Sequence, residues 1–239
     1  MEQIVNALML KAADYNENDK ILTLLTAERG RITAGIKGVK KAGAKLKFAA
    51  QPFCFAEYVL SRRGERYTVI NATECESFYD LRTDINKFYA ASSVAEAAYA
   101  ITFEGDDCAE IFSAAIRALS DMCTGSESLA LIEFLLVALK QSGYAVNAEN
   151  CYECGANLTE ESVLRFDMDA GAFTCGCCGR GAGASGVTYN VLRKLSGKSY
   201  KEECITADGE KRALRLIREY LSYKLNLSFK SLSEYIRLI

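Results

Sequence analysis

Two Cys-x2-Cys pairs constrain this chain more than any other feature of its sequence. The pairs are separated by twenty residues and consist of Cys151 with Cys154 and Cys175 with Cys178. Two residues between thiols allow a tight turn to direct both sulfurs at one metal ion. Two such pairs complete the closed four-thiolate shell of a structural zinc site. The spacing therefore predicts one structural Zn²⁺ bound by these four cysteines.

The residues around the pairs support a knuckle at each one. Gly155 and Gly179 directly follow the pairs, and glycine readily adopts the left-handed backbone that such turns prefer. Cys177 is a surplus thiol, but the x2 spacing of the first pair favours Cys178 as the fourth ligand. A [4Fe–4S] cluster also takes four thiolates, so the ligand types alone leave iron open. Catalytic zinc usually has histidine or carboxylate ligands and an open position, so we expect a structural ion.

The pairs lie in an insert at about 150–186. Within it, residues 164–167 and 172–173 fit a hairpin that turns at 169–171. The remaining cysteines fall singly, which is typical of small buried apolar residues. They are Cys54, Cys75, Cys108, Cys123 and Cys204.

The first 75 residues contain short runs rich in β-branched, aromatic and apolar types, several of them alternating. These runs predict strands at 4–11, 21–26, 31–37, 52–60 and 66–72. Five short strands in this length suit a small closed barrel such as the OB-fold, although an SH3-like barrel has similar strand statistics.

From Leu81 onward apolar residues recur at helical spacing. The predicted helices are 81–102, 107–122, 127–141, 187–197, 209–225 and 230–237. Residues 127–141 are apolar around most of the helix and so should be buried, and Thr124 with Glu127 has capping-box spacing. The predicted fold class is α+β: an N-terminal small β-barrel (OB-fold) at 1–78, then an α-helical domain at 79–239 that carries the four-cysteine zinc-binding insert.

Charge is distributed unevenly along the chain. Residues 29–66 hold ten basic and two acidic residues, a net of +8, whereas residues 67–192 carry a net of −12. A lysine-rich loop is often simply solvated, but this concentration favours a polyanion such as nucleic acid. The loop lysines are Lys37, Lys40, Lys41, Lys45 and Lys47, and a second turn carries Arg62, Arg63 and Arg66. Stacking candidates are Phe48, Phe53, Phe55 and Tyr67, although the alternation of Phe53 and Phe55 indicates that both face the core.

Several absences narrow the function. The chain has no histidine, which excludes an imidazole base. It shows no Ser/His/Asp set, no P-loop and no paired-carboxylate motif, so we expect no enzyme activity. No apolar run approaches the roughly 18 residues of a transmembrane helix, and the N-terminus does not resemble a signal peptide. We therefore expect a cytoplasmic protein without a membrane partner.

The sequence resembles the bacterial RecO family of recombination mediators. The resemblance rests on LMLKAADYNENDKILTLLTAERGRITAGIKGVKK near the N-terminus and YLSYKLNLSFKSLSEYI near the C-terminus, and it extends over essentially the whole chain. It implies binding and annealing of single- and double-stranded DNA, and loading of RecA, together with RecR, onto DNA coated by single-strand-binding protein. It also implies a nucleoid-associated location.

The resemblance assigns roles to individual residues. It implies DNA contacts at Arg31, Lys37, Lys40, Lys41, Lys45, Lys47 and Arg62, and a site for the acidic tail of single-strand-binding protein at Arg215 and Arg218. Lys211, Arg215 and Arg218 share one face of the predicted helix 209–225. The chain departs from the family at Lys230-Ser231-Leu232, where members often have lysine-serine-arginine, and in its additional Cys177. Some relatives lack the cysteines, which supports a structural metal.

The alternative function is a zinc-ribbon RNA-binding or transcription accessory factor, for which RNA would be the preferred ligand.

Overall fold

The computed structural model describes residues 2–197 and 205–239. Cys204, expected to be a buried apolar residue, lies outside these ranges. The chain forms two compact units, residues 1–127 and 128–239. The first unit contains the barrel and two α-helices. The boundary predicted after residue 78 concerns the barrel domain alone, and it stays a prediction.

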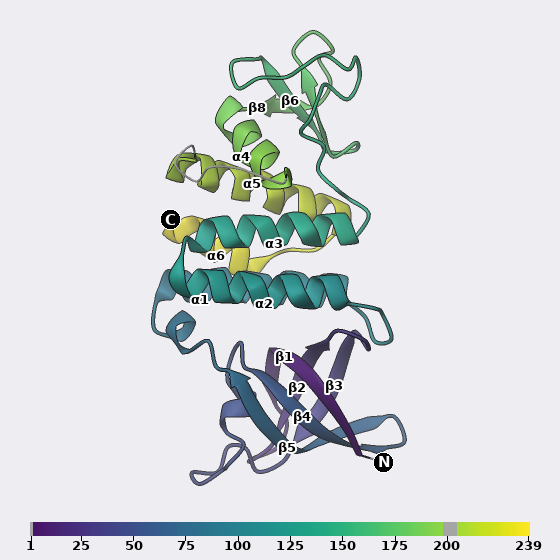
Figure 1. Ribbon diagram of the computed structural model, residues 1–239, viewed down its shortest axis with the longest axis vertical. Helices are drawn as coiled ribbons and strands as arrows, with labels where there is room; N and C mark the ends of the chain where they lie inside the picture. Colours follow the sequence, from purple (N-terminus) through teal and green to yellow (C-terminus); the bar gives the residue numbers. More distant parts are fainter. Residues whose placement is uncertain (1, 198–204) are drawn as a thin grey trace. The chain divides into compact units, whose positions relative to one another are not determined.

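The first unit begins with a closed five-stranded barrel (Figure 1). Its strands are β1 (Glu2–Asp14), β2 (Lys20–Thr26), β3 (Arg31–Ile36), β4 (Phe55–Arg63) and β5 (Arg66–Glu76). They follow the order β1-β2-β3-β5-β4, and β1 pairs with β4 to close the sheet. Neighbouring strands are antiparallel except β3 and β5, which are parallel. The predicted OB-fold barrel is confirmed, with strands close to the predicted ranges.

Alternation along each strand fills the barrel with side chains. Leu22, Leu24, Ile32, Ala34, Ala56 and Leu60 are among the residues buried inside it. The fully buried Tyr58 hydroxyl donates a 2.9 Å hydrogen bond to the Ala49 carbonyl oxygen. A buried hydroxyl without a partner would be costly, so this bond holds the segment before β4 against the barrel.

The lysine-rich stretch between β3 and β4, residues 37–47, is called the lysine segment below. Hydrogen-bonded turns make up much of this loop. Backbone N–H groups of Lys41, Ala44 and Lys47 donate to the carbonyl oxygens three residues earlier, and the short 3-10 helix η1 (Phe48–Ala50) follows. Val39 is buried, and Leu46 and Phe48 pack against the barrel core. The lysine segment is therefore a series of tight turns, attached to the barrel by Val39, Leu46 and the residue that follows the segment, Phe48.

Two helices complete the first unit. The 3-10 helix η2 (Tyr79–Arg82) leads into α1 (Ile85–Ile101), and α2 (Ala109–Thr124) follows. Phe53 and Phe55 form edge-to-face contacts with Phe88 of α1 and Phe112 of α2, at centroid distances of 5.6 and 5.8 Å. Both rings therefore face protein, Phe53 fully buried and Phe55 partly so.

One predicted helix cap is wrong. Thr124 was expected to cap the helix at 127–141, but it is the last residue of α2, and Gly125 ends that helix. Because Thr124 is already helical, it does not have the extended backbone of an N-cap residue. Helix α3 (Glu127–Gln141) nevertheless has the predicted bounds and is buried over most of its surface.

In the second unit, helices precede and follow the cysteine insert along the chain. Strands β6 (Leu164–Asp167), β7 (Ala172–Cys175) and β8 (Ala182–Ala184) form a three-stranded sheet in the order β7-β6-β8. Helices α4 (Gly186–Ser196), α5 (Ala207–Leu225) and α6 (Lys230–Leu238) follow (Figure 1). The predicted hairpin is confirmed as β6 and β7, and β8 was not anticipated. In the part of the chain that is described, no helix has the length and apolar character needed to cross a membrane.

The single cysteines differ in burial. Cys54 and Cys108 are buried as predicted, and Cys123 is partly buried. Cys75 is exposed, so the prediction is wrong there. It lies near the end of β5, where residues 73–76 are all exposed.

Candidate metal centre and basic surface

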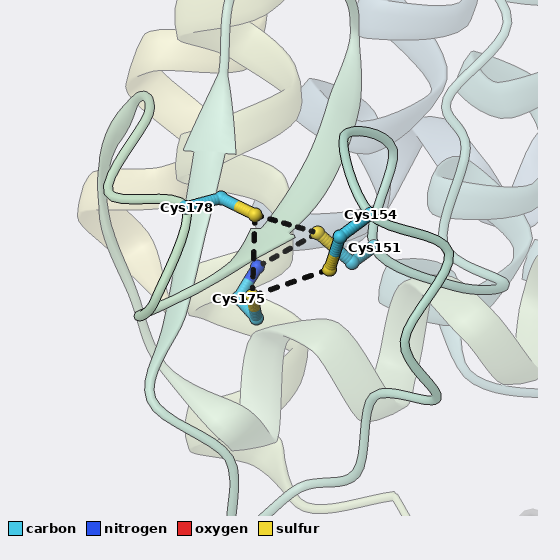
Figure 2. Close-up of side chains that lie close together, drawn as sticks. All are labelled: Cys151, Cys154, Cys175 and Cys178. Atoms are coloured by element: carbon cyan, nitrogen blue, oxygen red, sulfur yellow. Dashed lines mark hydrogen bonds between the residues drawn. The ribbon is translucent and has the colours of Figure 1, made fainter.

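Four thiols from the insert converge on one point, as Figure 2 shows. They belong to Cys151, Cys154, Cys175 and Cys178, and all their sulfurs lie within 4.8 Å of one another. The sulfur–sulfur distances are 3.8 Å for Cys151–Cys178, 3.7 Å for Cys154–Cys175 and 3.6 Å for Cys175–Cys178. These are the four residues that the spacing indicated, and together they could hold a metal ion.

The distances fit one ion in a tetrahedral shell. With Zn–S bonds of about 2.3 Å, tetrahedral geometry places the sulfurs about 3.8 Å apart. A [4Fe–4S] cluster would place several metal atoms between the thiolates and hold them farther apart. The geometry of the four-cysteine cluster therefore matches a single ion better than an iron–sulfur cluster.

Each Cys-x2-Cys pair forms the turn that its sequence indicated. Gly155 and Gly179 have φ values of 71° and 70°. The Gly155 N–H donates to the Cys151 carbonyl oxygen at 2.8 Å, and the Gly179 N–H donates to that of Cys175 at 3.3 Å. Glycine takes this left-handed conformation without the steric cost of a side chain. Both knuckles are therefore shaped by backbone bonds of the chain itself.

The surroundings of Cys151 favour its thiolate. Burial raises the pKa of this thiol, but backbone N–H groups of Cys154 and Cys175 outweigh burial and lower the pKa to about 6. The Cys175 N–H lies 3.3 Å from the Cys151 sulfur. Since metal ligands must be deprotonated, Cys151 is prepared for coordination near neutral pH.

An ionic clasp joins the two knuckles. Arg180, directly after the second knuckle, forms an ion pair with Glu153 of the first knuckle at 2.9 Å and another with Asp167 at the end of β6. Asp167 is almost fully buried and also accepts hydrogen bonds from the N–H groups of Asp169 and Ala170, at 2.8 and 3.1 Å. A buried carboxylate with several donors is well compensated, so the clasp fixes the hairpin beside the thiols.

An aromatic core connects the small sheet with the helices of its unit. Phe166 of β6 packs edge-to-face on Phe173 of β7 and on Tyr220 of α5, and Phe173 packs on Tyr189 of α4. The Tyr189 hydroxyl donates to the Leu158 carbonyl oxygen at 3.0 Å. The cysteine insert is thus part of the hydrophobic core of the second unit.

Cys177 stands apart from the four-cysteine cluster. It lies between Cys175 and Cys178 in sequence and is exposed, but its sulfur is not among those that converge. The sequence left the roles of these thiols partly open, and the structure brings Cys178 rather than Cys177 to the other three.

The predicted DNA-contacting lysines lie together on the lysine segment, and all are exposed. Lys40 forms an ion pair with Asp14, with 2.8 Å between Nζ and Oδ2. Within residues 2–197 and 205–239 the other lysines of the segment, Lys37, Lys41, Lys45 and Lys47, form no ion pair. The sequence reasoning missed Asp14, although the run DYNENDK between two predicted strands shows an acidic turn.

The two predicted arginine contacts are differently placed. The Arg31 guanidinium stacks 3.9 Å from the centroid of Tyr99 of α1 and also donates to the Tyr99 carbonyl oxygen. Arg62 is exposed near the end of β4, and its Nε donates to the carbonyl oxygen of Gly64 in the following turn at 2.9 Å. Arg31 is therefore engaged within the protein, whereas Arg62 faces solvent.

The stacking candidates mostly contact protein. Tyr67 and Phe53 are buried, and Phe48 packs against the barrel core.

On α5, Arg215 is exposed, Arg218 lies 3.6 Å from Glu219, and Lys211 donates to the Ile239 carbonyl oxygen at 2.7 Å. The adjacent apolar stripe, with Leu214 and Ile217, is buried.

Comparison with known families identifies both parts of the chain. Residues 1–79 match the family model "Recombination protein O N terminal", and residues 82–233 match "Recombination protein O C terminal". The N-terminal model describes an OB-fold domain, in agreement with the closed barrel. A barrel of this type followed by a helical domain with these matches defines a DNA repair protein of the recombination class.

Relatives of the chain are named DNA repair protein RecO. One from Desulfitobacterium hafniense is 31% identical over 197 residues, which cover 80% of this chain and 72% of the relative. One from Pelotomaculum thermopropionicum is 30% identical over 233 residues, 95% of this chain and 90% of the relative. The chain belongs to the RecO family of DNA repair proteins.

Proposed function

We propose that the chain is a DNA-binding recombination mediator. It binds single- and double-stranded DNA, anneals complementary strands and, together with RecR, helps to load RecA onto DNA coated by single-strand-binding protein. It acts at the nucleoid in the cytoplasm. The observation that carries the DNA-binding step is the exposed lysine segment, attached by Val39, Leu46 and Phe48 to an OB-fold barrel.

The form of the lysine segment suits phosphate contacts. Its turns present several ammonium groups from one short stretch, and each phosphate contact releases condensed counterions, so binding should weaken steeply with salt. Contacts to phosphates leave base edges free, and annealing requires free base edges. Arg62 would add a contact from the end of β4, whereas Arg31 would have to leave its stack on Tyr99 to reach DNA.

We also propose a structural role for a single Zn²⁺ in the four-cysteine cluster. The ion would be held by Cys151, Cys154, Cys175 and Cys178, and its contribution would be to cross-link the two knuckles. The thiolate-favouring surroundings of Cys151 and the 3.6–3.8 Å sulfur distances support this role. A shell of four protein ligands leaves no position for a substrate, so the centre would have no enzymatic role.

The acidic tail of single-strand-binding protein is proposed to dock on α5. Arg215 is exposed, and Arg218 is partly exposed one turn further along the helix. Two guanidinium groups at this spacing offer paired donors for carboxylates. This part of the proposal places partner binding in the second unit and DNA binding on the barrel of the first.

The first test is a salt titration of binding to fluorescent single-stranded DNA. Lys40→Glu/Lys41→Glu should bind at least about ten-fold more weakly at low salt than the original chain and show a shallower salt dependence, because phosphate contacts are lost. A charge-matched control is Arg117→Glu/Lys140→Glu, which changes two exposed basic residues outside the lysine segment.

Equal loss of affinity in both double variants would show that net charge alone is responsible, and would remove the lysine segment from the proposal. The same titration with RNA of equal length tests the alternative function. Tighter binding to RNA than to DNA would favour an RNA-binding accessory factor. Circular dichroism on each variant checks that the fold is retained.

A further inference from the structure

The tip of the β1–β2 hairpin, residues 14–20, lies against the lysine segment. The Lys40 N–H donates to the Asn18 carbonyl oxygen at 3.1 Å, and the Gly38 N–H donates to Asp19 Oδ1 at 2.8 Å. Lys37, Gly38 and Lys41 also line a shallow depression with residues 16–19. The predicted DNA-contacting residues are therefore in direct contact with an acidic turn.

Asp14 and Asp19 contact the segment in different ways. Asp14 forms its ion pair with the side chain of Lys40 and has Lys20 nearby, at 3.9 Å. Asp19 instead binds backbone, at the start of the segment, so its bond shapes the turn around Gly38. The hydrogen bond from Lys40 lowers the pKa of Asp14 below its usual value, which is the direction expected when an ammonium group stabilises the charged carboxylate.

Lys40 is therefore occupied before any DNA arrives. A phosphate that binds its ammonium group must displace Asp14 or share the ammonium with it, and the displaced carboxylate would remain close to the incoming phosphate. Lys45 and Lys47, farther along the segment, have no such acidic partner in the described ranges 2–197 and 205–239, and both are exposed. In the lysine segment, the charge of Lys40 is thus already paired with Asp14, whereas Lys45 and Lys47 can bind phosphate without first breaking an ion pair.

We propose that Asp14 is an internal competitor of DNA for Lys40, and that it sets the affinity and salt dependence of the lysine segment. This inference rests on the proposed DNA-binding function. Lys45 and Lys47 would contact phosphates first, and Lys40 would join after its ion pair with Asp14 opens. Asp14 is thus an affinity-limiting residue, and Asp19 is a positioning residue for the same segment.

The test is a double-mutant cycle on DNA affinity in the full chain, with Asp14→Asn, Lys40→Ala and both changes together. Asp14→Asn should bind single-stranded DNA about two- to five-fold more tightly at low salt, the range expected for one exposed ion pair. Its salt dependence should be steeper, by up to about 0.7 in the slope of log affinity against log salt, because one more phosphate contact forms without a competitor.

In the Lys40→Ala background, Asp14→Asn should have at most half of that effect, because its competitor role requires the lysine. Asp121→Asn, an exposed acid in the last turns of α2, reports the effect of net charge alone. Asp19→Asn keeps an amide oxygen for the Gly38 N–H, and it should change affinity less than Asp14→Asn.

The outcomes separate the two proposals. If Lys40→Glu/Lys41→Glu weakens DNA binding but Asp14→Asn gives no gain beyond Asp121→Asn, the competitor role is wrong and the DNA-binding proposal stands. An equal gain from Asp14→Asn with and without Lys40 also overturns the competitor role. If Lys40→Glu/Lys41→Glu binds like the charge-matched control, the lysine segment is not the DNA-binding surface, and the competitor role fails with it.

Discussion

At the scale of single residues, neighbours in sequence have different surroundings in the insert. Cys177 and Cys178 are adjacent, yet only the Cys178 sulfur reaches the other three within the described part of the chain. The spacing was sufficient to indicate this set because a Cys-x2-Cys turn is local, and Gly155 and Gly179 supply the backbone that it needs. Cys75 could not be assigned in the same way, because its exposure depends on where β5 leaves the barrel.

The adjacent thiols offer a matched test of the metal centre. Cys151→Ser or Cys175→Ser should release bound zinc and destabilise the second unit by several kcal/mol, since structural zinc contributes roughly 10 kcal/mol or more to small zinc domains. Cys177→Ser changes a thiol one residue from Cys178 and two residues from Cys175, and it should retain one zinc per chain. Colorimetric zinc release and thermal unfolding measure both effects. Loss of zinc from Cys177→Ser with retention in Cys175→Ser would replace Cys175 by Cys177 in the set of ligands.

At the scale of elements, the β2–β3 turn shows how one glycine joins the barrel to the helices of its unit. Gly30 has φ of +62°, and a Cβ atom there would lie 2.0 Å from the Phe103 carbonyl oxygen. Around it, the Arg31 N–H donates to that same oxygen at 3.1 Å, and the Gly105 N–H donates to the Arg29 carbonyl oxygen at 3.0 Å. The turn and the α1–α2 loop are therefore joined backbone to backbone.

Gly30→Ala and Gly64→Ala make a controlled pair. Gly64 also has a positive φ, +60°, but open space surrounds its Cβ position. Gly64→Ala should cost about 1–2 kcal/mol for the left-handed backbone alone, and Gly30→Ala about 3 kcal/mol or more because a backbone clash is added. Urea unfolding followed by circular dichroism measures both. Similar losses in the two variants would contradict the close approach to Phe103.

Sequence patterns located most elements but not their long-range pairing. The strand at 21–26 and the helix at 127–141 follow from local alternation and periodicity. The pairings of β1 with β4 and of β3 with β5 join segments far apart in the chain, and no local pattern encodes them. The prediction for Thr124 failed for a related reason. The capping-box spacing is a local pattern, but that pattern does not show that α2 extends as far as Thr124.

At the scale of the whole molecule, the chain separates two chemistries into two units. The lysine segment belongs to the unit at residues 1–127, and the four-cysteine cluster belongs to the unit at 128–239. Each unit has a core of its own, the barrel interior in one and the aromatic set around Phe166 in the other. We therefore expect the metal to stabilise one unit with little effect on the other.

Metal removal tests this separation. A strong zinc chelator should make residues 150–186 sensitive to protease while single-stranded DNA affinity changes by less than about two-fold, because the proposed phosphate contacts are on the barrel. Mass spectrometry of the fragments and fluorescence anisotropy give the two readouts on one sample. A parallel loss of DNA binding and protease resistance would show that the metal also supports the DNA-binding surface.

Closure of the barrel also limits the order in which the chain can fold during synthesis. Strand β1 has β2 as a neighbour early, but its second neighbour is β4, and β3 has to wait for β5. The ribosome must therefore have released residues to about Glu76 before every strand has both partners. Until then, the outer edges of β1 and β3 present unpaired backbone, a state in which nascent chains are prone to aggregate. The N-terminal unit would gain most from chaperone protection while its first 76 residues are being made.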